Sequence, residues 1–255
     1  MIILSAFFFA CMNVSVRLAG DLPSVEKSFF RNLVAAVFAA VILCKNRTVP
    51  KVDKKYWGPL ILRCVCGTLG ILCNFYAIDH LLVADASILN KLSPFFAIIF
   101  SFLLLKEKIR PAQAACVALA FIGCLFVVKS GFQNAALVPA LIGVCGGLGA
   151  GIAYTMVRVL GTHGVKGPVI VFYFSFFSCL SVVPWMLFHF TPMSMKQLVT
   201  LLMAGLFAAG GQFTITAAYT YALQGRFLSL IIHRLFLLRC WDLYCLERFR
   251  ISTVL

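Results

Sequence analysis

The chain has 255 residues, of which 62% are hydrophobic and 12% are charged, and its mean hydropathy is +1.01. A soluble domain carries about 25% charged residues, so the composition excludes an ordinary soluble globular protein. The formal net charge of +14 would suit a nucleic-acid partner. The basic residues, however, lie mostly in short loops between apolar stretches, which argues against nucleic-acid binding.

Eight apolar stretches, each about as long as a helix that crosses a bilayer, fill residues 1–222. A helix needs about 20 mostly apolar residues to cross the hydrocarbon core, so each stretch predicts a transmembrane span. The first stretch has no basic segment before it and no clear cleavage site, and we interpret it as a retained span, not a signal peptide. The sequence therefore predicts an all-α, polytopic membrane bundle. In chain order the predicted spans are Ile2–Leu18, Phe29–Cys44, Trp57–Ala77, Ala84–Leu105, Ala112–Val128, Leu137–Val159, Pro168–Phe188 and Leu198–Ala222.

The distribution of basic residues predicts the orientation of these spans. With a cytoplasmic N-terminus, the loops after the second, fourth and sixth spans carry ten basic residues, whereas the opposite loops carry three. Because cytoplasmic loops are enriched in lysine and arginine, this asymmetry predicts that the N-terminus is cytoplasmic. The ten are Lys45, Arg47, Lys51, Lys54, Lys55, Lys106, Lys108, Arg110, Arg158 and Lys166, and the three are Lys27, Lys129 and Lys196.

Two short similarities between distant spans indicate an internal repeat. Gly67–Phe75 and Gly205–Phe213, 138 residues apart, share a glycine, a carboxamide and a phenylalanine, and Val16–Leu18 matches Val157–Val159 at an offset of 141 residues. Matching spans are five positions apart, so the two copies must have opposite orientations, as in many secondary transporters. The alternative is chance similarity between apolar helices. The predicted organisation is a first repeat at 1–128, an incomplete second repeat at 137–222 and an atypical tail at 223–255.

The segment Ala84–Ala97, which contains Ser93-Pro94-Phe95-Phe96 and is followed by an apolar run ending in Lys106-Glu107, resembles a known helix. It is similar to the fourth helix of the EamA branch of the drug/metabolite transporter superfamily. Asn74–Ala77 resembles the third helix, Gln212–Tyr219 its counterpart in the second repeat, and Glu26–Arg31 the entry to the second helix. Within the branch, the chain looks closest to bacterial carriers of metabolites such as S-adenosylmethionine.

The resemblance implies ten helices, arranged as two inverted five-helix repeats, with both termini in the cytoplasm. This chain has about eight spans, and residues 223–255 depart from the family pattern. The apolar run Phe227–Leu238 is interrupted by His233 and Arg234, and a lipid-facing arginine at mid-bilayer costs roughly 2.5 kcal/mol or more. A shifted frame starting in the Leu223 codon can, with suitable synonymous codons, encode an unbroken ninth helix. We interpret the tail as a frameshift or degradation product; the alternative is a genuine polar tail on the cytoplasmic membrane surface.

Polar and aromatic side chains within the spans are the candidate substrate-binding residues. Lipid cannot satisfy carboxamides, so these are expected to face the interior of the bundle. Asn74 and Gln212 occupy equivalent repeat positions at the depth where such carriers bind substrate, and tyrosine rings could stack on a planar substrate. Hydrogen bonds between helices and aromatic packing are the alternative roles. The candidates are Asn13, Asn74, Tyr76, Asn90, Lys91, Tyr154, Gln212 and Tyr219.

Two cations have competing interpretations. Lys91 lies about a third of the way along the fourth span, where an ammonium group needs a partner or an aqueous cavity. It is expected either to snorkel to the outer surface or to contact an anionic or zwitterionic group of the substrate. Asp85, six residues earlier, lies nearly opposite on the helix and is not expected to pair with it. Arg31 is expected either to pair with Glu26, about one turn earlier, or to contribute to the site.

No catalytic motif accompanies these residues. The sequence lacks DDxxD, HExxH, GxSxG and Walker patterns, and its four histidines are scattered without metal-ligand spacing. The sequence therefore predicts no enzyme activity, no cofactor and no metal. It predicts a secondary transporter of small metabolites in the bacterial inner membrane, working by alternating access, with a small-molecule substrate and the lipid bilayer as partners; its oligomeric state is open. The alternative is a non-transporting membrane remnant, because the last two helices of the family are missing.

Overall fold

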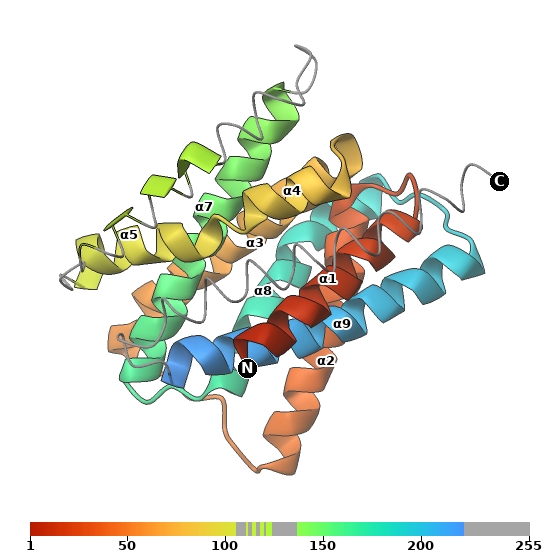
Figure 1. The fold of residues 1–255 in the computed structure, drawn as a ribbon. Coiled ribbons are helices and arrows are strands. Elements are labelled where there is room, and N and C mark those ends of the chain that lie inside the picture. Colours follow the sequence, from red (N-terminus) through yellow and green to blue (C-terminus); the bar gives the residue numbers. More distant parts are fainter. Residues whose placement is uncertain (106–110, 112–113, 116–117, 120, 124–136, 222–255) are drawn as a thin grey trace.

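Helices form the described part of the chain in the computed structural model, which covers residues 1–105, 111, 114–115, 118–119, 121–123 and 137–221 (Figure 1). A short 3-10 turn, Lys54–Tyr56, precedes α3. The helices are α1 Ile2–Leu18, α2 Ser24–Lys45, α3 Trp57–His80, α4 Val83–Asn90, α5 Ser93–Leu105, α7 Leu137–Thr162, α8 Gly167–Phe188 and α9 Met195–Tyr221. The prediction of an all-helical membrane bundle is confirmed.

Six segments of the described residues are long and apolar enough to cross a membrane, and α1 is a shorter apolar helix of 17 residues. The predicted span Ile2–Leu18 coincides with α1, whereas α2 begins at Ser24, five residues before the predicted Phe29. Pro23 directly precedes this helix and Glu26 lies in its first turn, where a carboxylate suits the helix dipole. Lys27, which the sequence analysis placed in a loop, is therefore a buried residue of α2.

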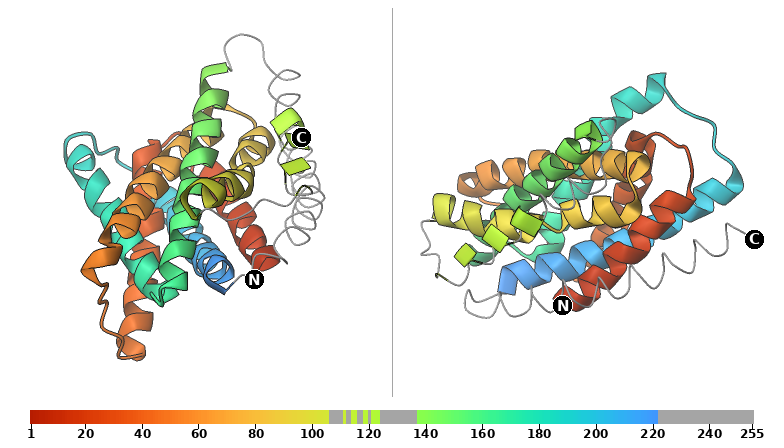
Figure 2. Two further views of the ribbon diagram at one scale, coloured as in Figure 1. Left: turned by 90° about the vertical axis from the view of Figure 1, so that its left-hand side faces the viewer. Right: turned by 45° about the horizontal axis from the view of Figure 1, so that its top comes forward.

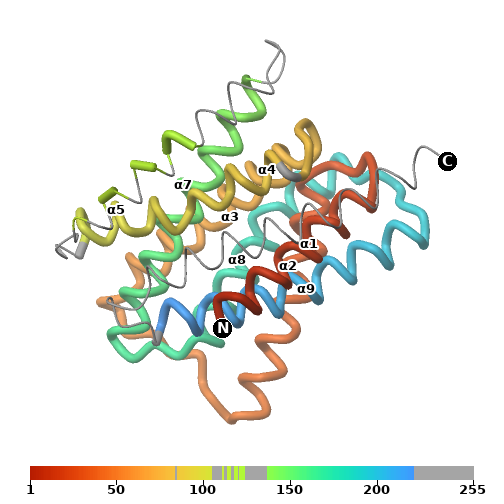
Figure 3. The backbone as a smooth tube through the Cα atoms, viewed as in Figure 1, coloured from red at the N-terminus to blue at the C-terminus, as the bar shows by residue number. Residues whose placement is uncertain are grey.

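The predicted fourth span, Ala84–Leu105, is interrupted. It consists of α4 and α5, which follow one another along the backbone and are separated by Lys91 and Leu92 (Figure 3). Pro94 is the cause, because proline has no N–H to donate to the carbonyl of Asn90 and its ring clashes with that carbonyl. Leu92 instead donates to the Leu89 carbonyl oxygen, at 3.2 Å.

Glycines of α7 bring this helix into close contact with two neighbours. A Cβ atom on Gly147 would lie 2.8 Å from the Leu89 carbonyl oxygen of α4, and one on Gly146 would lie 3.1 Å from the Asn74 backbone nitrogen of α3. Neither position has room for a side chain without a shift of the neighbouring backbone. The small residues of α7 therefore hold α3 on one face and the interrupted α4–α5 pair on another, as expected for helix packing in membranes.

The most extensive helix contacts fall into three pairs: α3 with α7, α1 with α9, and α2 with α8. The second pair is visible in Figures 1 and 2, where α1 and α9 run side by side. The members of each pair are distant in the sequence, so these contacts join the first part of the chain to the part after residue 137. The bundle is consequently a single packed unit.

Polar contacts join helix ends and loops at each end of the bundle. At one end, Lys166 donates to Thr48 at 3.5 Å and the Tyr173 hydroxyl donates to the Pro50 carbonyl oxygen at 2.8 Å. At the other end, Lys27 pairs with Asp79, and the Thr191 backbone N–H donates to Glu26 at 2.7 Å. The loops after the second and sixth predicted spans thus share one end, and those after the third and seventh share the other, as alternating spans require.

Two predictions fall on residues that the structure does not describe. The predicted span Ala112–Val128 lies largely outside the described residues, and the tail at 223–255 lies entirely outside them. The interpretation of the tail as a frameshift product therefore stays a prediction.

Candidate functional site

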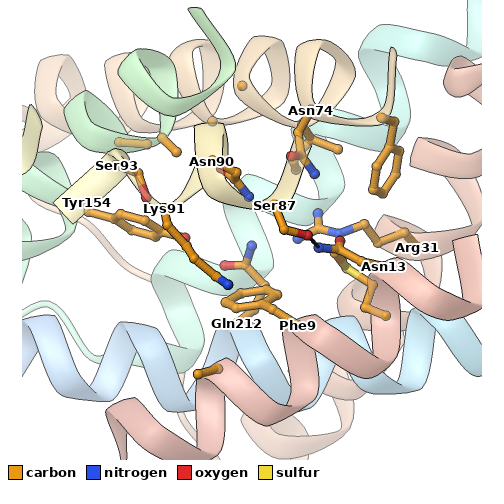
Figure 4. Close-up of a pocket in the computed structure, with 18 of the residues that line it drawn as sticks. Phe9, Asn13, Arg31, Asn74, Ser87, Asn90, Lys91, Ser93, Tyr154 and Gln212 are labelled. Atoms are coloured by element: carbon orange, nitrogen blue, oxygen red, sulfur yellow. Dashed lines mark hydrogen bonds between the residues drawn. The ribbon is translucent and has the colours of Figure 1, made fainter. Parts of the chain in front are cut away.

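A cavity of about 100 Å³ lies in the middle of the bundle, and every described helix from α1 to α9 contributes to its wall. Its lining combines apolar residues with carboxamide, hydroxyl and basic side chains (Figure 4). Six of the eight predicted site residues line it: Asn13, Asn74, Asn90, Lys91, Tyr154 and Gln212.

The interruption between α4 and α5 supplies one wall of the cavity. Asn90 ends α4, Lys91 follows in the interruption and Ser93 begins α5, and all three line the cavity. In Figure 4 the Lys91 side chain extends from this wall toward Gln212 and Phe9. Lys91 is half-buried and lines the cavity, and its role as a substrate contact stays a prediction. Discontinuous helices form the substrate sites of many transporters for the same reason: they expose polar backbone and side chains at membrane depth.

The α1 wall is joined to α4 by a hydrogen bond. The Asn13 side chain donates from Nδ2 to the Ser87 hydroxyl at 3.3 Å, and this contact is drawn in Figure 4. The Asn13 carboxamide oxygen is buried and has no hydrogen-bond partner among the described residues. A buried polar atom without a partner costs about 1–3 kcal/mol, so this oxygen is available to a donor on a ligand.

Asn74 and Gln212, which the repeat analysis paired, contribute to the same cavity from α3 and α9. Gln212 is buried, and its side-chain oxygen accepts a hydrogen bond from Nη2 of Arg63 at 3.2 Å. The Arg63 guanidinium also lies over the ring of Phe174, with its carbon 3.8 Å from the ring centroid. Through these contacts the Arg63 side chain joins its own helix, α3, to α8 and α9.

Sequence analysis did not identify Arg63 as a candidate, although its charge within the predicted span Trp57–Ala77 was a sufficient signal. Ser87 and Ser93 were also missed, because hydroxyls in apolar helices commonly bond to their own backbone. Arg31, considered for both a structural and a site role, lines the cavity with a side chain only 3% exposed. Its predicted pairing with Glu26 is not formed: Arg31 donates to Asn32 Oδ1 at 3.1 Å and to Met12 Sδ at 3.3 Å, whereas Glu26 accepts from Thr191.

Two predicted tyrosines do not line the cavity. Tyr76 stacks on His80, with ring centroids 4.0 Å apart, toward the end of α3. Tyr219 is buried and stacks on Tyr154, with centroids 4.9 Å apart and an interplanar angle of 12°. Tyr219 therefore packs against the Tyr154 ring, which lines the cavity, whereas Tyr219 does not reach the cavity.

Metal ligands do not converge in the described part of the chain, where no group of three or more His, Cys, Asp or Glu side chains is placed to hold an ion. The cavity combines several hydrogen-bond donors and acceptors and three basic side chains with the aromatic rings of Phe9, Phe75 and Phe174.

Comparison with known proteins agrees with this fold. The sequence profile of the EamA-like transporter family matches residues 1–129. The chain is 32% identical over 223 residues to the pseudopaline exporter CntI of Pseudomonas aeruginosa, covering 86% of this chain and 77% of the relative. It is 24% identical to a riboflavin transporter of Brucella anthropi, covering 84% and 78%. A solved crystal structure, 14% identical, superposes with a TM-score of 0.61 over 90% of this chain and 91% of its own, which shows a shared fold. The chain therefore belongs to the EamA-like transporter family.

Proposed function

We propose that the chain is a secondary transporter that moves a small metabolite across the bacterial inner membrane by alternating access, with the central cavity as its substrate site. The observation that carries the proposal is the meeting of polar side chains from both predicted repeats around one cavity. Asn13, Asn74 and Lys91 come from the first, and Tyr154 and Gln212 from the second.

The helix pairing supports two inverted repeats. If α1, α2 and α3 correspond to α7, α8 and α9, the contact of α3 with α7 is equivalent to that of α9 with α1. The contact of α2 with α8 is then equivalent to itself. These three pairs are the most extensive contacts of the bundle. A pseudo-two-fold relation of this kind is what alternating access requires, because each repeat can take the conformation of the other.

Polar contacts at the two ends of the bundle are candidates for the gates. Glu26–Thr191 joins α2 to the loop after α8 at one end, and Lys166–Thr48 joins two loops at the other. In alternating access, the contacts at one end would break while those at the other end stay formed, so that the cavity faces one side of the membrane at a time. Single hydrogen bonds suit this role since each is individually modest in energy.

The relatives restrict the substrate only to small metabolites, because one is a pseudopaline exporter and another a riboflavin transporter. The resemblance to S-adenosylmethionine carriers adds a third candidate, whose substrate carries a net positive charge. The relatives do not fix the direction of transport, so the experiment measures import and export together.

The test is untargeted mass spectrometry of cells and medium from a bacterial strain that expresses the chain, compared with an empty-vector strain. We expect at least one small metabolite to change its distribution across the membrane. Tyr154→Ala, which removes a ring from the cavity, should reduce that change at least tenfold. Tyr76→Ala is the matched control, because Tyr76 is equally half-buried and helical but lies outside the cavity.

An unchanged distribution of every metabolite, from a chain shown to reach the membrane, would contradict the proposed function and favour the non-transporting remnant. Equal loss in Tyr154→Ala and Tyr76→Ala would instead contradict the placement of the substrate site.

A further inference from the structure

Two arginines from different helices line the cavity and are almost fully buried. The exposed fractions are 3% for Arg31 on α2 and 1% for Arg63 on α3. In Figure 4, Arg31 lies beside Asn13 on one flank of the cavity. Both residues lie well inside segments apolar enough to cross a membrane. Ionisable residues at such depth are rare in membrane proteins and mark substrate or ion pathways.

Neither guanidinium pairs with a carboxylate among the described residues. The hydrogen bonds of Arg31 go to the Met12 sulfur and the Asn32 carboxamide, and that of Arg63 goes to the Gln212 carboxamide. The Nε atom of Arg63 is buried without any hydrogen-bond partner in the described part of the chain. Neutral partners orient the two guanidinium groups but leave their charges uncompensated.

The lining of the cavity has a single sign of charge. Besides the two arginines it contains Lys91, and the described residues that line it include no aspartate or glutamate. A buried charge without a counter-charge is strongly unfavourable, more so when a second like charge is close. The two buried arginines, which have no carboxylate partner among the described residues, are therefore explained by an anion that enters the cavity.

A purely structural role does not account for these residues as well. The bonds of Arg31 and Arg63 to carboxamides could be made by a neutral glutamine or asparagine, which would avoid the desolvation of a charge. Arginine adds a planar fork of N–H groups that matches the two oxygens of a carboxylate or phosphate. The presence of the charged fork at two positions of one cavity thus points to a ligand.

We propose that the substrate of the cavity is a small polyanion, with at least two carboxylate or phosphate groups held by Arg31 and Arg63 and assisted by Lys91. This inference rests on the proposed transport function, whose site it specifies further. It opposes a cationic substrate such as S-adenosylmethionine, because a net positive ligand would add to the uncompensated charge. The aromatic side chains of the lining would contact the carbon skeleton between the anionic groups.

The test is direct binding, which does not require transport. The full chain is placed in nanodiscs of phosphatidylcholine, which carry no anionic lipid, and its melting temperature is measured with glutarate or with glutaramide. These two compounds share a carbon skeleton and differ in charge. Citrate, glycerol 1-phosphate and S-adenosylmethionine are added as further probes, and ionic strength is matched with sodium chloride. We expect glutarate or citrate to raise the melting temperature in a saturable way, glycerol 1-phosphate, which has one anionic group, to raise it less, and glutaramide and S-adenosylmethionine to have no effect.

Variants identify the groups responsible. Arg31→Gln and Arg63→Gln should each weaken anion binding roughly 30-fold or more, because each removes one partner of a buried charge pair. Arg31→Lys and Arg63→Lys should weaken binding less, because they keep the charge and lose only the fork. Arg17→Gln is the matched control: Arg17 is exposed and donates to the Ile78 carbonyl oxygen outside the cavity. The comparison of glutarate with glutaramide on the unmodified chain decides the question even if a variant fails to fold.

Equal stabilisation by glutarate and glutaramide, stabilisation by S-adenosylmethionine, or no stabilisation by any anion would overturn the inference. An effect of added phosphatidylglycerol without an effect of the small anions would also overturn it, because the cavity would then bind a lipid headgroup. Transport of a neutral metabolite in the cell assay would contradict the anionic substrate and leave the transport function intact. Anion binding without any transport would contradict the transport function alone.

Discussion

A single buried ion pair shows how strongly individual charges constrain this protein. The Lys27 ammonium is 1% exposed and is paired with Asp79, whose side chain is 20% exposed. Asp79 also accepts a hydrogen bond from the Ser24 hydroxyl at 2.9 Å. Breaking a buried pair by removing one partner is costly because the other charge stays buried without compensation. The pair therefore fixes the start of α2 against the end of α3.

We predict that Asp79→Asn destabilises the protein by about 3 kcal/mol, since the Lys27 ammonium would stay buried without a counter-charge. The double variant Lys27→Gln with Asp79→Asn should be more stable than the single variant, because it leaves no uncompensated charge. Thermal unfolding in detergent measures both. A double variant less stable than Asp79→Asn alone would show that charge compensation is not the reason.

At the scale of elements, the interrupted α4–α5 pair and the glycines of α7 depend on one another. The Leu89 carbonyl oxygen lies next to the interruption, and Gly147 of α7 packs against it with no space for a Cβ atom. Glycine at this position lets α7 approach closely enough to hold Asn90 and Lys91 at the cavity wall. The shape of the cavity wall is thus decided by a proline on one element and a glycine on the other.

We expect Gly147→Ala to destabilise the protein by about 1–3 kcal/mol through overpacking, because its Cβ would lie 2.8 Å from the Leu89 carbonyl oxygen. Gly123→Ala is the matched control: this helical glycine is exposed, and a Cβ added to it would have no atom within 4 Å. Alanine should therefore be neutral or slightly stabilising there. Melting temperatures of the two variants in the same detergent provide the measurement. Equal effects at both positions would refute the role of close packing.

At the scale of the whole molecule, polar contacts show which loops and helix ends lie together at each end of the bundle. Thr48 and Lys166 meet at one end of the bundle, and Glu26 and Thr191 meet at the other. The first end carries most of the basic loop residues of the described chain, including Arg47 and the lysines that follow it. By the positive-inside rule we expect this end to face the cytoplasm.

Reporter fusions test this orientation. A fusion at Lys51 should report the cytoplasm and a fusion at Thr191 the opposite side of the membrane, because the two positions lie in loops at opposite ends of the bundle. A phosphatase that is active only outside the cytoplasm and a fluorescent protein that is fluorescent only inside it provide complementary signals. Reports from the same side would refute the orientation of the spans between these positions.

Much of the fold and part of the site could be predicted from the sequence. Apolar length alone located the helices, as α1 shows with both of its boundaries, since a helix in lipid satisfies its own backbone. Carboxamides within spans were expected at the interior, and Asn74 and Gln212 do line one cavity. Arg63 was not predicted as a site residue, although its charge lies within the predicted span Trp57–Ala77.

Other properties were decided only by the tertiary structure. A proline in an apolar run signals an interruption, but which side chains the interruption presents to a cavity depends on the helices packed around it. The sequence likewise could not show that Arg31 bonds to Met12 and Asn32 while Glu26 bonds to Thr191, because these partners are brought together by packing. Hydrophobicity is a property of each segment by itself and can be determined from the sequence. Charge compensation is a property of neighbours in space. That Arg31 and Arg63 have no carboxylate partner among the described residues therefore became apparent only when the helices were assembled.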